Sequence, residues 1–513
     1  MQLFIILIYF AVTVVIGVLS SKKSKSSDSF HGTAMGLFAI VAASTGEWLG
    51  GTSTTGVSEY GFDYGLSGAW YTISNGIGIM FLAFFFAKLY RSLNSVTVPG
   101  IIEKFFGVKA RTVSSILLTL VMLAVGLSQM IAAGKLGQSL LGFPFVPTVL
   151  VFALIFIVYT LAGGMNAVAS TNKMHLFVMY GGVILAIIFA VIKIGGFDAI
   201  FSGLNGSNMS PETADAIAQA KASAAAAGHA FKAPPQGEAS RYLNMFTIGL
   251  PKVSSWIIAS LLGACTAQAG IQPVLAAKDI PTAKKACIIT AFVAAPFGLF
   301  TAFLGMSAKA MFNNGTMLYD KSGELINGKS ALPTLMMNIH DNPTIGGIVG
   351  GLVLASILAA ILSTVSPIIL SSGTMVTKDL YQRVLKTDAT DAQVLRMSRI
   401  TTALSGVICA VGAIALVEAS AVLDIVYAAY SLRGALFIVV LFGIYWKRAS
   451  EKGACWSMVI TGAVAIFWKA YYMANGSYPI TNSITETYAA VIVAAITVIL
   501  FSVIFPKKKI AEV

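Results

Sequence analysis

The sequence predicts an all-α integral membrane protein with about 13 transmembrane helices. Of its residues, 57% are hydrophobic and 11% are charged, whereas soluble proteins carry roughly 25% charged residues. Mean hydropathy is +0.83. Segments 3–20, 147–162 and 486–505 each approach the ~20 apolar residues that cross a bilayer core. Lipid offers backbone groups no hydrogen-bond partner, so these spans must be helical.

Hydropathy places the spans in order along the chain, with boundaries good to a few residues. They are predicted at 3–20, 34–57, 66–88, 112–140, 147–165, 172–194, 247–273, 286–310, 344–375, 397–417, 420–445, 453–473 and 486–505. An odd number of spans puts the two termini on opposite sides of the membrane.

Basic residues lie in short clusters between the spans. A net charge of +13 can indicate nucleic-acid binding. These clusters, however, occupy every second loop, and in membrane proteins the cytoplasmic loops are the ones enriched in Lys and Arg. We therefore expect no nucleic-acid partner, a location in the cell membrane, an outside N-terminus and a cytoplasmic C-terminus. The clusters are Lys22, Lys23 and Lys25; Lys88 and Arg91; Lys278, Lys284 and Lys285; Arg383, Lys386, Arg396 and Arg399; Lys447, Arg448 and Lys452; and Lys507, Lys508 and Lys509.

Two predicted helices are interrupted by glycines in corresponding positions, five helices apart. The first, 34–57, contains Gly46, Gly50, Gly51 and Gly56, and the second, 247–273, contains Gly263 and Gly270. A matched pair of broken helices is typical of inverted-repeat transporters with a site at the bilayer midplane. Unwound backbone frees carbonyl and amide groups for ligands and is tolerated only around a cavity. The alternative is that these glycines only permit close helix packing.

Adjacent hydroxyls in the span 344–375 suggest a cation site. Ser363 and Thr364 lie one turn beyond Ala360. A helical Ser or Thr commonly bonds the carbonyl one turn earlier, which is the plainer interpretation. The Ala360 carbonyl and the two hydroxyls would nevertheless supply three neutral oxygens for a monovalent cation, and an unwound neighbour could supply two more.

These segments resemble the sodium/solute symporter family, and matches run in order over about residues 1–505. The segment 359–364 continues through Thr377-Lys378-Asp379-Leu380-Tyr381, as in the family's eighth core helix. The other matching segments are Thr97-Val98-Pro99-Gly100 with Lys104-Phe105-Phe106-Gly107; Tyr159-Thr160-Leu161-Ala162-Gly163-Gly164-Met165-Asn166-Ala167-Val168; Gln268 and Gln272 with Ala276-Ala277-Lys278-Asp279; and Tyr445-Trp446-Lys447-Arg448 with Gly453-Ala454.

The resemblance implies a ten-helix core of two inverted five-helix repeats, 34–194 and 247–445, each with a discontinuous first helix. Residues 1–33 would form an N-terminal helix and basic loop, 195–246 an extracellular loop with an amphipathic helix over Ala214–Ala227, and 446–513 two further helices and a basic tail. The resemblance also implies a sodium site formed by Ala360, Ser363 and Thr364, with carbonyls of Ile40 and Ala43.

The sequence departs from the family pattern at a few positions. Gly100 replaces a Glu, Thr171-Asn172 with His175 replaces a T-D…Q motif, and Pro273 replaces an Arg. We expect most of these positions to face the cytoplasmic side and to bear on gating. They prevent transfer of a particular substrate from the family.

Ionisable residues within a membrane are costly, and they are functional candidates by default. Glu47 follows the first glycine of the broken helix, and Arg433 lies mid-span in 420–445. Together they could hold the amino and carboxyl groups of a zwitterion. Alternatively, they pair with each other, or Arg433 only closes a gate. For Lys135 we expect snorkelling to a helix end.

Further candidates for a solute cavity are aromatic and amide side chains, because small-molecule sites combine apolar walls with a few polar groups. For each of them, packing or interfacial anchoring is the alternative. They are Trp48, Trp70, Gln129, Gln268 and Tyr427.

We therefore expect sodium-coupled symport of a small organic solute, such as an amino acid, by alternating access. The sequence has no phosphate loop, zinc-ligand spacing or catalytic triad, so neither an enzyme nor an ATP-driven pump is expected. The expected partners are the solute and the bilayer, with no obligatory protein partner. Alternatives are proton coupling through Glu47, a channel, or a sensor, although the sequence ends at Val513 without a signalling module.

Overall fold

The computed structural model describes residues 2–21, 30–31, 34–226, 228, 231, 233–417 and 422–507. Over these residues the chain is almost entirely helical, and its β structure is limited to two isolated bridges. The predicted all-α class is confirmed. Six residues named in the sequence analysis lie outside the described residues: Ala227 and the basic residues Lys22, Lys23, Lys25, Lys508 and Lys509.

Nine helices of the described chain are long and apolar enough to cross a membrane, or ten if one bent pair counts as a single span. Three shorter apolar helices, Gln2–Gly17, Leu37–Trp48 and Phe145–Val158, lie outside that count. The protein is therefore multi-pass, and the predicted total of about 13 spans stays a prediction.

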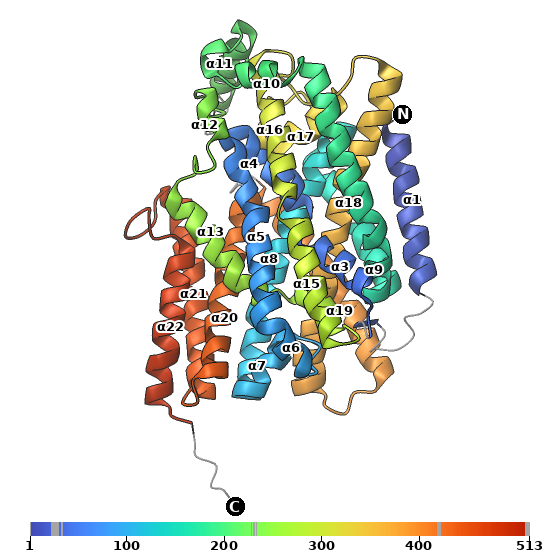
Figure 1. Cartoon of the computed structure of the whole chain (residues 1–513). Coiled ribbons are helices and arrows are strands. Elements are labelled where there is room, and N and C mark those ends of the chain that lie inside the picture. Colours follow the sequence, from blue (N-terminus) through green and yellow to red (C-terminus); the bar gives the residue numbers. More distant parts are fainter. Residues whose placement is uncertain are drawn as a thin grey trace, which may run out of the picture.

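The first half of the chain forms helices that stand side by side in the bundle (Figure 1). They are α1 (Gln2–Ser21), α3 (Leu37–Trp48), η1 (Thr52–Gly56), α4 (Val57–Tyr64), η2 (Gly65–Ala69), α5 (Trp70–Phe81), η3 (Leu82–Phe86), α6 (Ala87–Ser92), α7 (Val98–Phe106), α8 (Val108–Leu141) and α9 (Phe145–Ile194).

The second half begins with short helices at one end of the bundle and then returns through it. These elements are α10 (Phe197–Gly203), η4 (Gly206–Asn208), α11 (Pro211–Ala226), α12 (Ala239–Leu243), α13 (Leu250–Gly263), η5 (Ala264–Thr266), α14 (Gln268–Leu275), α15 (Ile280–Ala294), α16 (Phe297–Asn313), α17 (Gly328–Met337), α18 (Pro343–Met375), η6 (Val376–Leu385), α19 (Asp391–Leu416), α20 (Val422–Tyr445), α21 (Glu451–Asn475) and α22 (Glu486–Ile504).

Both helices predicted to be broken are discontinuous. In the first, α3 ends at Trp48, and the chain resumes in the π-helical turn η1 before continuing as α4 to Tyr64. The predicted boundary at residue 57 was therefore one to two turns too early. In the second, α13 and η5 are separated from α14 by a bend of 42° at Ala267. The glycines thus mark real interruptions.

The predicted loop between spans 147–165 and 172–194 is helical, which corrects the sequence-based boundary. The segment α9 (Phe145–Ile194) consists of two helices that meet directly at a kink at Gly164, where φ is 55° and ψ is −154°. Glycine tolerates this conformation because it has no Cβ. The sharp break therefore needs one residue rather than a loop.

The N-terminal end of α1 and the described C-terminal end of the chain lie at opposite ends of the bundle (Figure 1). Helices α10, α11 and α12 cap the end where α1 begins, and α11 covers the expected amphipathic helix. Basic clusters meet at the other end, near α6 and α7, where Arg91 donates to the Ala277 carbonyl and Arg383 to Glu103.

Candidate functional site

The two interrupted helices meet in the middle of the bundle. The Ser44 hydroxyl on α3 donates to the Gly270 carbonyl on α14 over 3.2 Å. A Cβ on Gly270 would lie 3.0 Å from Cζ2 of Trp48. Glycine at this position therefore lets the Trp48 ring lie directly on α14, which fixes the last turn of α3 against the second broken helix.

Glu47, in that last turn of α3, lies opposite Arg433 of α20. The Arg433 Nη1 and Glu47 Oε1 atoms are 3.9 Å apart, and neither side chain is exposed. No charged atom of either group has hydrogen-bond geometry with any described residue. Buried charges are normally paired and hydrogen-bonded, so this is an ion pair with unused hydrogen-bonding capacity. The sequence allowed for this mutual pairing as an alternative.

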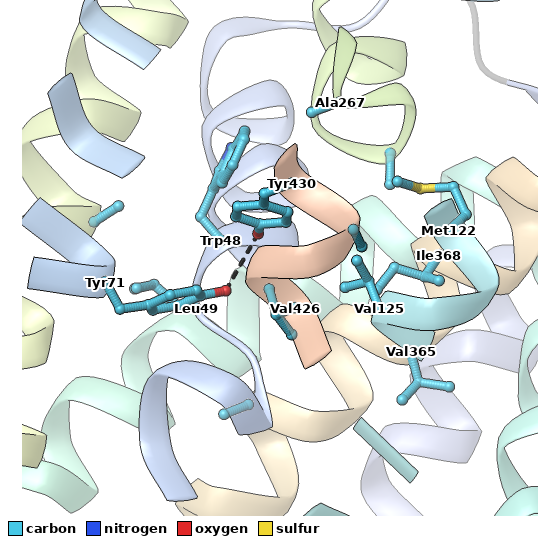
Figure 2. Close-up of a cluster of buried hydrophobic side chains, with 14 of the residues drawn as sticks. Trp48, Leu49, Tyr71, Met122, Val125, Ala267, Val365, Ile368, Val426 and Tyr430 are labelled. Carbon is cyan, nitrogen blue, oxygen red and sulfur yellow. Dashed lines mark hydrogen bonds between the residues drawn. The ribbon is translucent and has the colours of Figure 1, made fainter. Parts of the chain in front are cut away.

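Aromatic rings enclose the pair. The Arg433 guanidinium lies 3.8 Å from the centre of the Tyr430 ring and 5.3 Å from that of Trp48. Figure 2 shows the hydrogen bond of 3.2 Å between the Tyr430 and Tyr71 hydroxyls, with Trp48 beside Tyr430. Such contacts hold the guanidinium in place by cation–π attraction.

Tyr427 forms the neighbouring wall of this site. Its ring stacks on Trp256 with a centroid distance of 4.2 Å, and its hydroxyl lies 3.1 Å from that of Ser74. Its ring centre also lies 5.7 Å from that of Tyr430, so Tyr427 adjoins the rings around the pair, and its role as a cavity residue stays a prediction.

The predicted sodium ligands of α18 are buried beside α3. The Ser363 hydroxyl donates to the Ala360 carbonyl over 2.8 Å, and the Thr364 hydroxyl donates to the Gly46 carbonyl. For Ser363 the structure therefore shows the plainer interpretation, a hydroxyl that bonds the carbonyl one turn earlier. A hydroxyl that donates its proton keeps two lone pairs, so both groups remain able to bind a cation.

The contact between α18 and α3 lies further along α3 than the resemblance implied. Thr364 contacts Gly46, three residues beyond Ala43 and six beyond Ile40. Both Ile40 and Ala43 are buried on α3, and their roles as ligands stay predictions. Gly46 is a candidate that sequence reasoning missed, although the two glycines at 50 and 51 allow more than one alignment of this helix.

Asn172 of α9, one of the departures from the family pattern, adjoins this site. Its amide donates to the Ser363 carbonyl over 3.2 Å, and a Cβ on Gly46 would lie 2.2 Å from its Nδ2 atom. A neutral amide therefore orients the backbone next to the predicted ligands, and it adds no negative charge there.

The predicted amides Gln129 and Gln268 have backbone partners. Gln129 accepts from the Thr52 N–H over 3.3 Å at the start of η1. Gln268 accepts from the Val98 N–H over 2.8 Å and donates to the Val96 carbonyl. Gln129 therefore stabilises the first helix break and Gln268 the start of α7, and their binding of solute stays a prediction. Trp70 donates to the Met245 carbonyl over 2.9 Å.

Asn75 of α5 is a candidate that the sequence did not single out. Both polar atoms of its amide are buried without a hydrogen-bond partner. It lies four residues after Tyr71 and three before Gly78, so all three share one helix face. A Cβ on Gly78 would lie 2.2 Å from the Ser260 carbonyl, so this face packs toward the second broken helix. The sequence feature that could have indicated this residue is a lone Asn within an apolar span.

Charged residues close the other end of the bundle. Arg111 donates to Asp379 over 2.5–2.8 Å and to Glu103 over 2.5 Å, and Thr97 donates to Asp379. Partial burial by itself raises the pKa of Glu103, but hydrogen bonds from Arg383 and Arg111 outweigh it and hold that pKa below its usual range. The family-like segments around Thr97 and Asp379 are thereby joined in one cluster.

A multi-pass bundle with two broken helices around a buried ion pair, beside a set of neutral oxygens, defines a secondary transporter. Residues 30–462 match the model of the Sodium:solute symporter family, which is most of the chain. The protein therefore belongs to the sodium:solute symporter family. It is a sodium-coupled transporter of a small solute, and sodium is the co-transported ion.

Individual relatives are more distant. The sodium/glucose cotransporter of Vibrio parahaemolyticus is 24% identical over 477 residues, which are 90% of this chain and 84% of the relative. The sodium/mannose cotransporter SLC5A10 of Bos taurus is 27% identical over 404 residues, 75% of this chain and 64% of the relative. At these identities the relatives support the family and leave the solute open.

Two solved structures share the fold. One is a Na⁺-coupled sialic acid symporter in a substrate-bound outward-open state, with a TM-score of 0.75 and 18% identity over 99% of both chains. The other is MhsT in complex with L-phenylalanine, with a TM-score of 0.52 and 14% identity over 92% of this chain and 99% of that one.

Proposed function

We propose that the solute is a small zwitterion or amine-bearing carboxylate, such as an amino acid, bound between Glu47 and Arg433. The observation that carries this proposal is the buried ion pair, whose atoms lie 3.9 Å apart and lack hydrogen-bond partners among the described residues. A carboxylate suits the planar, bidentate guanidinium, and an ammonium group suits Glu47. A zwitterion inserted between them would satisfy both.

The aromatic walls and Asn75 support the same class of solute. Trp48, Tyr71 and Tyr430 surround the pair, which suits a small apolar side chain, and the free amide of Asn75 would add a hydrogen bond. Rejection of analogues is strong where a buried polar group would be left unpaired. A neutral solute without a carboxyl group would leave the Arg433 guanidinium unpaired in this way.

We also propose that sodium binds the Ala360 carbonyl and the Ser363 and Thr364 hydroxyls, together with α3 carbonyls. Thr364 contacts the Gly46 carbonyl, which favours Gly46 as one α3 ligand, with Ile40 and Ala43 as the ligands that the family resemblance implies. The shared position of Gly46 and Glu47 would couple the two sites, because any movement of this turn alters both.

For the membrane arrangement we propose an outside N-terminus, a cytoplasmic C-terminus and inverted repeats at 34–194 and 247–445. The basic clusters near α6 and α7 support this orientation, since cytoplasmic loops are enriched in Lys and Arg. Sodium entry down its gradient would then drive uptake. Each unit charge crossing ~100 mV contributes about 2.3 kcal/mol.

A thermal-shift screen of the purified protein tests the solute class. Amino acids, amines, glucose, mannose, sialic acid and simple carboxylates would each be added with and without sodium. We expect zwitterions to raise the melting temperature most, and only with sodium present. Stabilisation by neutral sugars alone would eliminate the zwitterion. Uptake into proteoliposomes at fixed pH, with and without sodium, separates sodium coupling from proton coupling through Glu47.

A further inference from the structure

A carboxylate from an outer loop is bound by two buried side chains of α8. The Glu324 Oε2 atom lies 3.7 Å from the Lys135 Nζ atom, and Gln138 donates to Glu324 Oε1 over 3.3 Å. Lys135 and Gln138 are 7% and 5% exposed, whereas the Glu324 side chain is 55% exposed. The binding groups are thus fixed inside the protein, while the carboxylate comes from its surface.

Glu324 uses only the amide N–H of Gln138. The Gln138 Oε1 atom is buried and has no hydrogen-bond partner among the described residues. Lys135 also borders a narrow recess with no room for a water molecule, lined by Thr55, Glu59, Ile131, Ala132, Lys135, Lys329 and Val422. A second carboxylate can therefore reach Lys135 only in place of Glu324.

Both cations and carboxylates surround the recess. Lys135 and Lys329 line it together with Glu59, whose carboxylate accepts from the Val422 N–H over 3.2 Å. Lys329 donates to the Val417 carbonyl. Glu324 adds a carboxylate to Lys135 from outside the recess.

The recess lies directly outward of the first helix break. A Cβ on Gly51 would lie 2.8 Å from the Ala132 Cβ, and Thr55 donates to the Gly51 carbonyl over 2.7 Å. Lys135 is one turn beyond Ala132 on α8. Lys329, which lines the recess, belongs to α17, and α17 lies toward the end of the bundle where α1 starts (Figure 1), which is the outer end in the orientation proposed above.

We propose that Lys135 and Gln138 form an outer binding site for the carboxylate of the incoming solute, and that Glu324 occupies this site until the solute displaces it. The inference rests on the proposed function for its carboxylate-bearing solute. Exchange of one carboxylate for another keeps the charge balance of the site. A partly exposed ion pair is weak, so Glu324 is readily displaced.

The loop that carries Glu324 is held together by its own hydrogen bonds. The Asp320 N–H donates to the Glu324 carbonyl over 2.9 Å, and an Asp320 carboxylate oxygen accepts from the Glu324 N–H over 3.0 Å. Release of the Glu324 side chain from Lys135 therefore leaves the hydrogen bonds of the turn intact.

Spin-label mobility on this turn tests the proposal. A nitroxide would be placed on Ser322→Cys in a Cys455→Ser background, since Cys455 is the half-buried cysteine and the other three are buried. Sodium acetate is the probe, with sodium chloride at equal ionic strength as the reference. We expect acetate to mobilise the label with half-maximal effect on the order of millimolar.

In Lys135→Gln we expect a label that is mobile from the start and does not respond to acetate. The matched control is Lys193→Gln, which removes the ion pair with Asp341 near α10 and should leave the acetate response intact. A wild-type label that ignores acetate overturns the proposal, and so does a response that survives in Lys135→Gln.

A second measurement separates the outer site from the inner one. Arg433→Lys is expected to weaken binding of the solute found by the thermal screen, yet to retain the acetate response of the label. Loss of that response in Arg433→Lys would mean that acetate acts at the inner site, which overturns the outer one. If the transported solute is a neutral sugar, the proposed solute class fails regardless of the label.

Discussion

The two predicted binding regions lie side by side on α3 but differ in how their polar groups are satisfied. At the sodium region, the Ser363 and Thr364 hydroxyls donate to carbonyls of Ala360 and Gly46. At the solute region, Glu47 and Arg433 are buried as an ion pair without hydrogen bonds to the described chain. The first uses neutral oxygens, and the second uses full charges.

This difference implies different costs for the two regions. A neutral hydrogen bond contributes only about 0.5–1.5 kcal/mol net, so the sodium region can lose a hydroxyl and stay folded. A buried ion pair contributes little stability, but removal of one partner leaves an unpaired charge. In the function proposed above, a solute would therefore satisfy the hydrogen bonds that the ion pair lacks, and a sodium ion would bind neutral oxygens that are stable without it.

The largest expected effect is that of Arg433→Gln. This change leaves Glu47 buried and unpaired, which costs roughly 3–5 kcal/mol, and it should abolish uptake. The double variant Glu47→Gln with Arg433→Gln should recover part of the stability, because no lone charge remains. Thermal unfolding of the purified variants measures both. A double variant no more stable than the single would show that the pair is not energetically coupled.

The next effect is confined to the ion. Ser363→Ala with Thr364→Ala should keep the fold but raise the sodium concentration for half-maximal uptake at least tenfold, which corresponds to about 1.4 kcal/mol. The sodium-dependent shift in melting temperature measures it. Ser372→Ala is the control, since Ser372 is a buried hydroxyl of the same helix that accepts from Ser405. Unchanged sodium affinity in the double variant would remove the site assignment.

A smaller change at Gly46 tests the link between the regions. In Gly46→Ala the new Cβ would lie 2.2 Å from Asn172 Nδ2 and 2.8 Å from the Ser363 carbonyl. We expect weaker binding of both sodium and solute, because α3 must shift away from α18. Gly181→Ala is the matched control, with no atom within 4 Å of its added Cβ. Equal effects of the two variants on sodium affinity would contradict the close approach at Gly46.

The smallest expected effect on sodium and solute binding comes from His31, which belongs to neither region. Burial, and then the positive charge of Lys378, lower its pKa to about 3, against about 6.5 when unfolded. Between these values the unfolded chain binds more protons, so stability falls as pH decreases below about 6.5, by up to about 1.4 kcal/mol per pH unit.

His31→Gln should flatten this pH dependence while sodium and solute affinities at pH 7.5 stay unchanged. Melting temperatures at pH 7.5, 6 and 5 measure the slope. The replaced side chain bonds Thr374 over 3.0 Å, which Gln can also do, so a general loss of stability is not expected. A slope as steep in His31→Gln as in the wild type would assign the pH dependence to other groups.

The helices and their interruptions were largely predictable. Apolar length fixes helical spans because lipid leaves the backbone no other partner, and the glycines at 50, 51 and 263 marked the breaks. The boundary errors have local causes. Gly164 breaks α9 in one residue, so the expected loop after span 147–165 is helix. The π turn η1 extends the first broken helix to Tyr64.

The side-chain partners were less predictable, because they depend on rotation and register of packed helices. Glu47 and Arg433 lie 386 positions apart in the numbering but meet at 3.9 Å, and their types suggested the pairing. Nothing in their types placed Gln268 on the backbone of Val96 and Val98. An amide side chain can hydrogen-bond either to a solute or to the backbone, and only the packing of the helices decides which partner it has.

By itself, the sequence determined a helical membrane protein, its likeness to sodium/solute symporters and the residue types of its sites. Composition and period decide these because the bilayer constrains every span in the same way. Tertiary structure decided that Thr364 contacts Gly46, that Arg433 lies over Tyr430 and that Glu324 reaches Lys135. Such contacts depend on how each helix is rotated about its axis and how closely it approaches its neighbours. The hydrophobic pattern of the sequence does not fix either of these within a helical turn.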